Sequence, residues 1–287
     1  MFADLHLHTR FSDGSFTPEQ VVEHAAKKRL STLALTDHDT LEGCAPMAAA
    51  CAAAGIEFIP GLELTVEHAD HEIHLLGYFL DPEDENLRRE IALFQSVRQD
   101  RIREMVLRLN RLGVPLRAED VFALADCRSP GRPHVARALA ELGHCRTMDE
   151  AFERFLKRHR PAWVPKHKLS AASAIELVHR AGGLAVMAHP GLNRTDSSIP
   201  DLAAAGMDGL ECFHSRHSTA QMQHYLAIAG ELSLLITGGS DCHGDGRGKP
   251  LIGTIKLPYE YGRQLKRRVA ERRSAAPPPP ADALTSA

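Results

Sequence analysis

The chain has 287 residues, of which 44% are hydrophobic and 25% charged, as is typical of a globular protein with a sizeable core. The formal net charge of -3 gives no overall signature of nucleic-acid binding, so we expect no stable association with duplex nucleic acid. No apolar stretch approaches the roughly 18 residues that a membrane span needs. Histidine is abundant, with 17 residues against 4 tyrosines and 1 tryptophan, which suggests metal ligation or acid–base chemistry.

The cysteines and the N-terminus indicate a cytoplasmic protein. The six cysteines form no CxxC pair, and in a long, core-rich chain this favours free thiols in a reducing compartment. The chain begins in a strand-like segment with acidic residues and histidines, which is unlike a signal peptide.

Strand-like apolar runs and amphipathic helical stretches alternate along much of the chain. The predicted strands are Phe2–His8, Thr32–Thr36, Glu57–Leu64, Ile73–Phe79, Leu184–Ala188, Gly209–Phe213 and Leu234–Thr237. The predicted helices among them are Pro18–Leu30, Leu41–Ala54 and Ala171–Ala181, with Thr17 as N-cap of the first. Such alternation, with functional residues at strand ends, predicts an α/β fold built as a (β/α) barrel of seven strands.

Residues 81–164 interrupt this alternation. Their pattern predicts helices at Asp84–Leu112, Arg117–Ala125, Pro133–Leu142 and Met148–Lys157. We therefore expect an all-helical insertion that divides a barrel made of residues 1–80 and 165–273. The insertion is rich in arginine, Arg98 and Arg101 included, and most of these should lie on solvated helix faces. The Pro- and Ala-rich tail, residues 274–287, is predicted to be disordered.

One loop of the insertion has a composition that suits an anion site. Ser129, Arg132 and His134 surround a Pro-Gly pair just before a predicted helix. Hydrogen-bond donors ahead of a helix N-terminus can bind an anion. Arg132 or His134 would then contact the substrate, and the alternative is an ordinary solvated arginine loop.

The first two clusters of polar residues lie at, or a few residues past, the ends of the first two predicted strands. His6 and His8 are two residues apart, so both side chains leave the same face of a strand and could share a cation. Asp13, taken alone, could equally serve a Phe-Ser-Asp-Gly turn. His38 could ligate a metal, with the flanking Asp37 or Asp39 orienting an imidazole.

The other candidates lie at later strand ends. Glu63 interrupts an apolar run, where a buried carboxylate is costly unless it is paired or bound to metal. His74 lies in a similar run, His189 ends another, and Asp241 and His243 follow the last. The nine residues exceed the ligands of one catalytic ion, and mixed His and carboxylate donors suit Zn²⁺, Mn²⁺ or Fe²⁺. We therefore expect two or three divalent metals, most simply Mn²⁺.

The ordered series resembles the PHP (polymerase and histidinol phosphatase) family over residues 1–80 and 165–257. It comprises His6-x-His8, Asp13, Thr36-Asp37-His38, Glu63, His74, His189-Pro190 and Asp241-x-His243. The resemblance implies a distorted seven-stranded TIM-like barrel with two or three metals. The insertion, with its Ser-Pro-Gly-Arg-Pro-His loop, is similar to the subgroup that removes the 5′-phosphate from 3′,5′-nucleoside bisphosphates or trims short RNAs from their 5′ ends.

The resemblance also implies one grouping of the ligands. The first metal would take His6, His8, Glu63 and Asp241; the second Glu63, His74 and His189; the third Asp13, His38 and His243. Hydrolysis would use a metal-bound hydroxide without a covalent intermediate. Asp37 or His214 could transfer the proton to the leaving group, and Ser129, Arg132, His134 and Arg216 are the candidate substrate contacts.

Several functions remain open at this point. The predicted substrate is a small anionic nucleotide, most simply a 3′,5′-nucleoside bisphosphate. A 5′→3′ exoribonuclease acting on short RNA would use the same centre, and a histidinol phosphate phosphatase is a weaker alternative. A non-catalytic PHP module is a further alternative, although the ligand set is complete.

Overall fold

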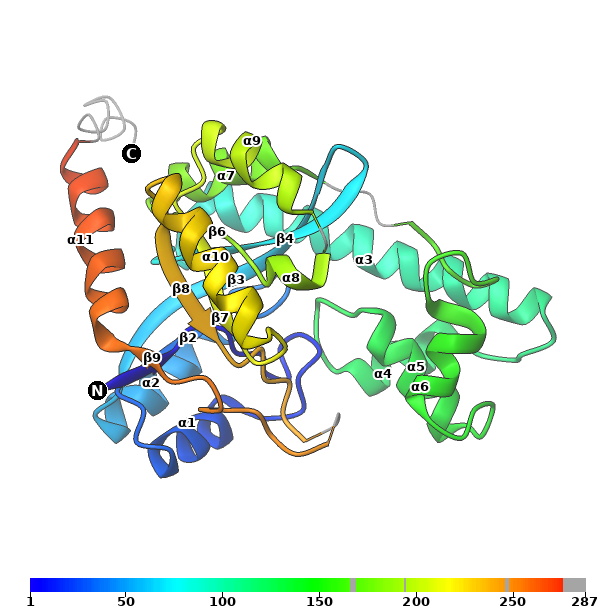
Figure 1. Ribbon diagram of the computed structural model, residues 1–287. Helices are drawn as coiled ribbons and strands as arrows, with labels where there is room; N and C mark the ends of the chain where they lie inside the picture. The colour runs from blue at the N-terminus through cyan, green and yellow to red at the C-terminus, as the bar shows by residue number, and fades with distance from the viewer. Residues whose placement is uncertain (166–168, 194, 246–247, 276–287) are drawn as a thin grey trace, which may run out of the picture.

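The computed structural model describes residues 1–165, 169–193, 195–245 and 248–275 (Figure 1). Within them one curved sheet contains β1 (Phe2–Asp4), β2 (Thr32–Leu35), β3 (Glu57–His68), β4 (His71–Tyr78), β5 (Leu169–Ser170), β6 (Leu184–Met187), β7 (Gly209–His214), β8 (Leu235–Gly239) and β9 (Leu257–Pro258). The strand order is β8-β7-β6-β4-β3-β2-β1-β9, and β5 pairs with β3.

Hydrogen bonds between the extension of β1 and the end of β8 bring the two sides of this sheet together. Leu5 N donates to Gly238 O (3.1 Å), and Asp241 N donates to His6 O (2.9 Å). The result is a nearly closed barrel, which confirms the predicted α/β barrel fold. The two-residue strands β5 and β9 are additional to the seven strands that we expected.

Strand β4 interrupts the parallel order within the barrel. β4 is antiparallel to both of its neighbours, β3 and β6. A tight turn joins β3 to β4, and its residues Ala69 and Asp70 have φ values of 47° and 63°. Two successive left-handed residues match the twist of a hairpin. His74 consequently reaches the barrel mouth from within a strand rather than from a strand end.

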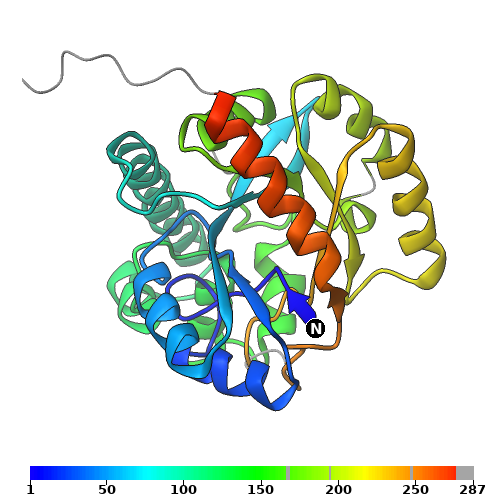
Figure 2. The ribbon, with the colours of Figure 1, turned by 90° about the vertical axis from the view of Figure 1, so that its left-hand side faces the viewer.

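Helices cover the outside of the barrel (Figure 2). They are α1 (Pro18–Lys27), α2 (Cys44–Ala54), α7 (Ala171–Arg180), α9 (Ile199–Ala204), α10 (Thr219–Glu231) and α11 (Tyr259–Ala275), with a 3₁₀ turn, η2, at Asp196–Ser198; the one-turn helix α8 (Pro190–Asn193) lies in the loop after β6. Thr17 caps α1 as predicted, because its side chain accepts a hydrogen bond from Gln20 N. No helix in the described ranges has the length and apolarity needed to cross a membrane.

Helix α11 is anchored to the barrel by a partly buried ion pair. Arg272 contacts both oxygens of Asp208, at 2.5 and 3.0 Å, and Asp208 is 4% exposed. Ser274 and Ala275 belong to this helix, so the predicted disorder is wrong for them. Residues 276–287, the rest of the predicted tail, lie outside the described residues.

The helical segment contains α3 (Glu85–Arg111), α4 (Ala118–Ala125), α5 (Arg132–Glu141), α6 (Met148–Ala151) and a π-helical turn, η1, at Phe152–Leu156. Its second half has a hydrophobic core of its own, to which Met105 and Leu139 belong. Helix α3 joins the two cores, because Leu87 and Ile91 near its start pack into the barrel core. The segment projects from the side of the barrel opposite α11 (Figure 1).

Candidate metal centre

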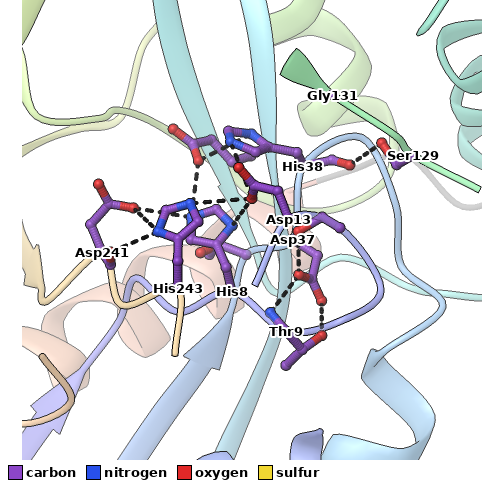
Figure 3. Close-up of polar contacts among 12 residues, drawn as sticks. His8, Thr9, Asp13, Asp37, His38, Ser129, Gly131, Asp241 and His243 are labelled. Carbon is purple, nitrogen blue, oxygen red and sulfur yellow. Dashed lines mark hydrogen bonds and ion pairs between the residues drawn. The ribbon is translucent and has the colours of Figure 1, made fainter. Parts of the chain in front are cut away.

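The nine predicted ligands converge at one mouth of the barrel. They come from the loops after β1, β2, β6 and β8 and from within β3 and β4. Figure 3 shows several of their side chains pointing toward one another. Two of the loop residues, His189 and Asp241, adopt positive φ values of 30° and 53°. Such conformations are costly for non-glycine residues and tend to cluster at functional sites.

Glu63 lies at the centre of the cluster and is 1% exposed. One carboxylate oxygen contacts His74 Nδ1 (2.6 Å) and His189 Nε2 (3.1 Å). The other contacts three imidazole nitrogens at 3.2–3.3 Å, those of His6, His8 and His38. Burial alone would raise the pKa of the Glu63 carboxyl, but the surrounding imidazoles outweigh it and hold the pKa well below its usual range. Glu63 is therefore an anion at neutral pH and can bridge two cations.

Asp241 and Asp13 supply the carboxylates on the other side. Asp241 Oδ1 lies 3.4 Å from His6 Nε2 and 3.2 Å from His8 Nε2. Burial acts to raise the pKa of Asp241, whereas His6 and His243 lower it, and the net pKa is well below its ordinary value. Asp13 Oδ1 lies 3.2 Å from His243 Nε2.

The donor atoms form groups of the size that a metal ion needs. One group is His6, His8, Glu63 and Asp241, another is His8, Asp13, His38 and His243, and a third is His38, Glu63 and His74; in each group the donor atoms lie within 4.8 Å of one another. Ring nitrogens of His8, His38 and His189 are buried without a hydrogen-bond partner among the described residues. Nitrogen and carboxylate donors in this mixture fit divalent transition metals.

A cleft of ≈ 740 Å³ opens over the cluster. His38, Glu63, His74 and His189 line its floor, together with Asp13, Asp241 and His243. The rest of its lining carries five cations, Arg98, Arg101, Arg132, Lys157 and Arg216, and three carboxylates, Glu72, Asp149 and Glu153. This excess of cations around the ligands suits an anionic substrate whose phosphate reaches bound metal ions.

Comparison with known proteins identifies the family. The PHP domain model matches residues 4–130. A 3′,5′-nucleoside bisphosphate phosphatase from Chromobacterium violaceum is 35% identical over 264 residues, which cover 89% of this chain and 92% of that protein. The chain belongs to the PHP family.

Two other relatives are similar to this chain, one compared by sequence and one by its crystal structure. The 5′-3′ exoribonuclease Rnm of Salmonella typhimurium is 33% identical over 250 residues, 84% of each chain. A Bifidobacterium adolescentis protein assigned to the metal-dependent phosphoesterases has a crystal structure that superposes with a TM-score of 0.86 at 34% identity, covering 93% of this chain and 96% of that one. The resemblance found in the sequence is confirmed, and this PHP protein is a hydrolase of phosphate esters.

The structure gives Asp37 a different environment from the one that proton transfer requires. It is fully buried beneath the loop after β1 and lies outside the cleft lining. Its carboxylate accepts hydrogen bonds from Thr9 N (2.7 Å), Thr9 Oγ1 (2.5 Å) and Ser12 Oγ (2.5 Å). Figure 3 shows its bonds to Thr9. We propose that Asp37 fixes the loop that presents Asp13 instead of moving a proton.

Two of the predicted substrate contacts also have internal partners. Ser129, 1% exposed, donates its hydroxyl to His38 O at 2.5 Å, as Figure 3 shows. His134 is 2% exposed, and its Nδ1 accepts a hydrogen bond from Gly131 N. Ser129 and His134 both fall within the described ranges, and neither lines the cleft. Arg132 and Arg216 do line it. Ser129 thus ties the insertion to a predicted metal ligand.

Sequence reasoning missed Glu211, Arg98 and Arg101. Glu211 interrupts an apolar strand just as Glu63 does, so the same signal could have found it. Arg98 is not on a solvated face: it is 7% exposed, and its Nε lies 2.5 Å from Asp39 Oδ2. Arg101 lines the cleft. The sequence does not show which face of α3 meets the barrel, so these two arginines resembled surface residues.

Proposed function

We propose that this PHP enzyme removes the 5′-phosphate from a 3′,5′-nucleoside bisphosphate, leaving a nucleoside 3′-phosphate and inorganic phosphate. The observation that carries the proposal is a pair of arginines, Arg101 and Arg132, on the cleft wall above the metal-ligating residues. Burial lowers the pKa of Arg101, and the charge of Arg132 lowers it further. Glu72, 3.8 Å from Arg132, offsets this charge in part. A second phosphate on the substrate would neutralise the remaining positive charge of Arg101 and Arg132 through charge-assisted hydrogen bonds.

The similarity to the Chromobacterium bisphosphate phosphatase supports the same substrate class. Histidinol phosphate fits less well, because it offers a single phosphate to two cationic regions. We place the reaction in the cytoplasm, in keeping with six cysteines that are all free thiols.

The metal ions would be held by three sets of residues. They are His6, His8, Glu63 and Asp241; Glu63, His74 and His189; and Asp13, His38 and His243. We propose Mn²⁺ as the metal, with Zn²⁺ or Fe²⁺ as alternatives. Such ions, when bound, act as Lewis acids and lower the pKa of a coordinated water to about 7.

The protein's own groups position the substrate and balance its charge. Arg216 lines the same cleft as the ligands and can neutralise oxygens of the reacting phosphoryl group as negative charge develops, whereas Arg132 would contact the second phosphate. His214 is fully buried, its Nδ1 accepts a hydrogen bond from Arg216 N (3.2 Å), and its Nε2 lies 3.4 Å from Asp241 Oδ2, so we propose that it orients the Asp241 carboxylate. His214 does not line the cleft, and this orienting role needs no contact with the leaving group.

Replacing Arg132 with Met tests the second-phosphate site. We expect KM for adenosine 3′,5′-bisphosphate to rise about 10- to 100-fold, because a hydrogen bond to a charged group contributes about 1.5–3 kcal/mol. KM for AMP should change less than about twofold, since AMP lacks the second phosphate. Phosphate release, measured with both substrates, gives the two values.

Arg146→Met is the matched control, since Arg146 is 92% exposed on the insertion and pairs only loosely with Glu150 at 3.3 Å. It should change neither KM. Equal effects of Arg132→Met on both substrates would remove the case for a second-phosphate site.

A 5′→3′ exoribonuclease is the second candidate, and one feature favours it. The cleft continues from the metal-ligating residues past Arg132 to Phe152 on the π-helical turn. An aromatic side chain there could stack a further base. A Mn²⁺-dependent screen of adenosine 3′,5′-bisphosphate, AMP, histidinol phosphate and a short 5′-phosphorylated RNA separates the candidates. Release of mononucleotides from RNA, faster than phosphate from the bisphosphate, would favour the exoribonuclease.

Removing the metal is expected to abolish activity and to lower stability. Protein stripped by a chelator should regain activity with Mn²⁺ and bind at least two equivalents. Ions present at about 100 times their Kd would add about 2.7 kcal/mol to the free energy of unfolding for each site. Elemental analysis and thermal unfolding measure both effects. Less than one equivalent, with no activity restored by Mn²⁺, would support a non-catalytic PHP module.

A further inference from the structure

Glu211 in β7 contacts two of the metal-ligating histidines from behind the cluster. It is completely buried, and its Oε1 lies 2.9 Å from His6 Nδ1. Its Oε2 accepts a hydrogen bond from the backbone N–H of His189 at 2.7 Å. Oε1 thus contacts His6 in the segment that extends β1, and Oε2 contacts His189 in the loop after β6. The Glu211 carboxylate therefore links three separate segments of the barrel.

An irregularity in β7 makes this placement possible. Glu211 is paired with Thr237 of β8, but Phe213 is already paired with Gly238, so β7 has one extra residue between them. Regular alternation would put Glu211 and His214 on opposite faces of the sheet. With the bulge both are fully buried beside His6, whose ring centroid is 6.1 Å from that of His214. Bulges commonly re-aim a side chain next to an active site.

Two glycines in β8 allow the segment that extends β1 and the β7 bulge to approach this strand closely. A Cβ on Gly239 would lie 2.4 Å from His6 N, and a Cβ on Gly238 would lie 2.5 Å from Phe213 Cβ. Only glycine at these positions lets the β1 extension and the bulge pack against β8. The strand geometry around Glu211 is thus closely constrained.

The contact with Glu211 determines which nitrogen His6 can offer to a metal. A carboxylate accepts hydrogen bonds, so the 2.9 Å contact places the proton on His6 Nδ1. The other nitrogen, Nε2, points away from Glu211 toward Glu63 (3.3 Å) and Asp241 (3.4 Å). With its Nδ1 proton held by Glu211, His6 can offer Nε2 as the nitrogen that would coordinate a metal ion.

The same carboxylate also stabilises the backbone that carries His189. The positive φ of His189 is an unfavourable conformation for a residue with a side chain. A charge-assisted hydrogen bond to its N–H compensates part of that cost. His189 Nε2 is then directed to Glu63 Oε1 at 3.1 Å.

We propose that Glu211 is a positioning residue of the metal centre: it fixes the tautomer of His6 and the backbone of His189 without binding a metal. The inference rests on the proposed ligand set. A cation among His6, Glu211 and His214 would also satisfy donor spacing. The hydrogen-bond length of the contact to His6, and the use of the second oxygen by His189, favour positioning over ligation.

Glu211→Gln is the direct test. The amide keeps the size of the side chain and can still accept from His189 N–H through its oxygen. Its NH₂ group would then face His6 Nδ1 and drive the ring proton to Nε2, toward the cations. We expect Mn²⁺ affinity to fall about 10- to 100-fold, with the number of ions bound at saturation unchanged. Titration of metal-free protein with Mn²⁺, followed by the EPR signal of free Mn²⁺, measures both quantities without any substrate.

Asp208→Asn is the matched control. Asp208 is also a buried carboxylate next to β7, and it also accepts from a histidine ring, His179 Nε2 (2.8 Å), and from a β6 amide, Ala185 N (2.9 Å). It lies before β7, at the end of that strand away from the metal-ligating residues. This variant should unfold more easily yet bind Mn²⁺ with unchanged affinity.

Two outcomes would overturn the proposal. Mn²⁺ affinity within twofold of the unmodified protein would show that Glu211 does not position the ligands. Loss of one whole equivalent at saturation would show that it is itself a ligand. If Glu211→Gln does not fold, as judged by circular dichroism of the metal-free form, Glu211→Asp takes its place. Its shorter side chain should weaken affinity in the same way, and the same two results would overturn the proposal. Because no substrate is used, a wrong assignment of the substrate leaves this test intact.

Discussion

Replacing Glu63 with Gln is expected to abolish measurable phosphate release while the protein remains folded. Glu63 makes five imidazole contacts, at 2.6–3.3 Å, and is the residue shared by two of the three proposed metal sites. An amide has no negative charge with which to bridge two cations. Metal catalysis is worth several kcal/mol, so we expect kcat to fall about 10³-fold or more. Steady-state phosphate release and Mn²⁺ binding are the measurements.

Glu67→Gln provides the control for this experiment. Glu67 lies on the same strand, four residues further along, and its side chain is exposed. Its replacement should leave both turnover and metal binding unchanged. Asp241→Ala should behave like Glu63→Gln. Substantial activity in both the Glu63 and Asp241 variants would show that the metal site is wrongly assigned.

Replacing Arg98 with Met is expected to cause a large loss of stability, of about 3–5 kcal/mol. Arg98 Nε lies 2.5 Å from Asp39 Oδ2, and both side chains are almost entirely buried, at 8% and 2% exposure. Without the guanidinium, the buried Asp39 carboxylate would lose the salt bridge that Arg98 provides. Because Asp39 directly follows His38, we also expect weaker Mn²⁺ binding. Chemical denaturation of the metal-free protein measures the free energy of unfolding.

A second substitution distinguishes the loss of a partner from a general packing defect. Adding Asp39→Asn to Arg98→Met removes the negative charge that lost its Arg98 partner, and Asn tolerates the positive φ of 49° at this position. The double variant should be more stable than Arg98→Met alone. Arg103→Met, which breaks an exposed pair with Asp100 on the same helix, should cost less than about 1 kcal/mol. A double variant no more stable than the single one would contradict the ion-pair explanation.

Three arginines of α3 have environments that the sequence pattern does not predict. Arg98, Arg101 and Arg103 lie within six residues on one helix, yet Arg98 is buried, Arg101 lines the cleft and Arg103 is exposed. Their different environments depend on which side of α3 faces the barrel. That orientation follows from the packing of Leu87 and Ile91 into the barrel core, a contact between distant segments that sequence periodicity cannot specify.

Strand direction and strand irregularity are equally hidden from a sequence pattern. His74 stands out as a candidate ligand in the sequence, but its position on an antiparallel strand depends on the Ala69–Asp70 turn, which has no Asn-Gly or Asp-Gly signature. Glu211 and His214 both lie beside His6 because β7 contains a bulge between them, whereas strict alternation would place them on opposite faces of the sheet.

The sequence by itself determined the chemistry of this protein. The identity of a donor atom belongs to its residue, and ligands placed after successive parallel strands must meet at one mouth of a barrel. The positions of His6, His8, His38, His189 and Asp241 after predicted strands are therefore enough to predict that they lie together. Only the tertiary structure decided what surrounds them: the buried pair of Arg98 and Asp39, the hydroxyl of Ser129 on His38, and the carboxylate of Glu211 behind His6. These contacts join segments that are 59, 91 and 205 residues apart, and the sequence pattern of either segment carries no information about its distant partner.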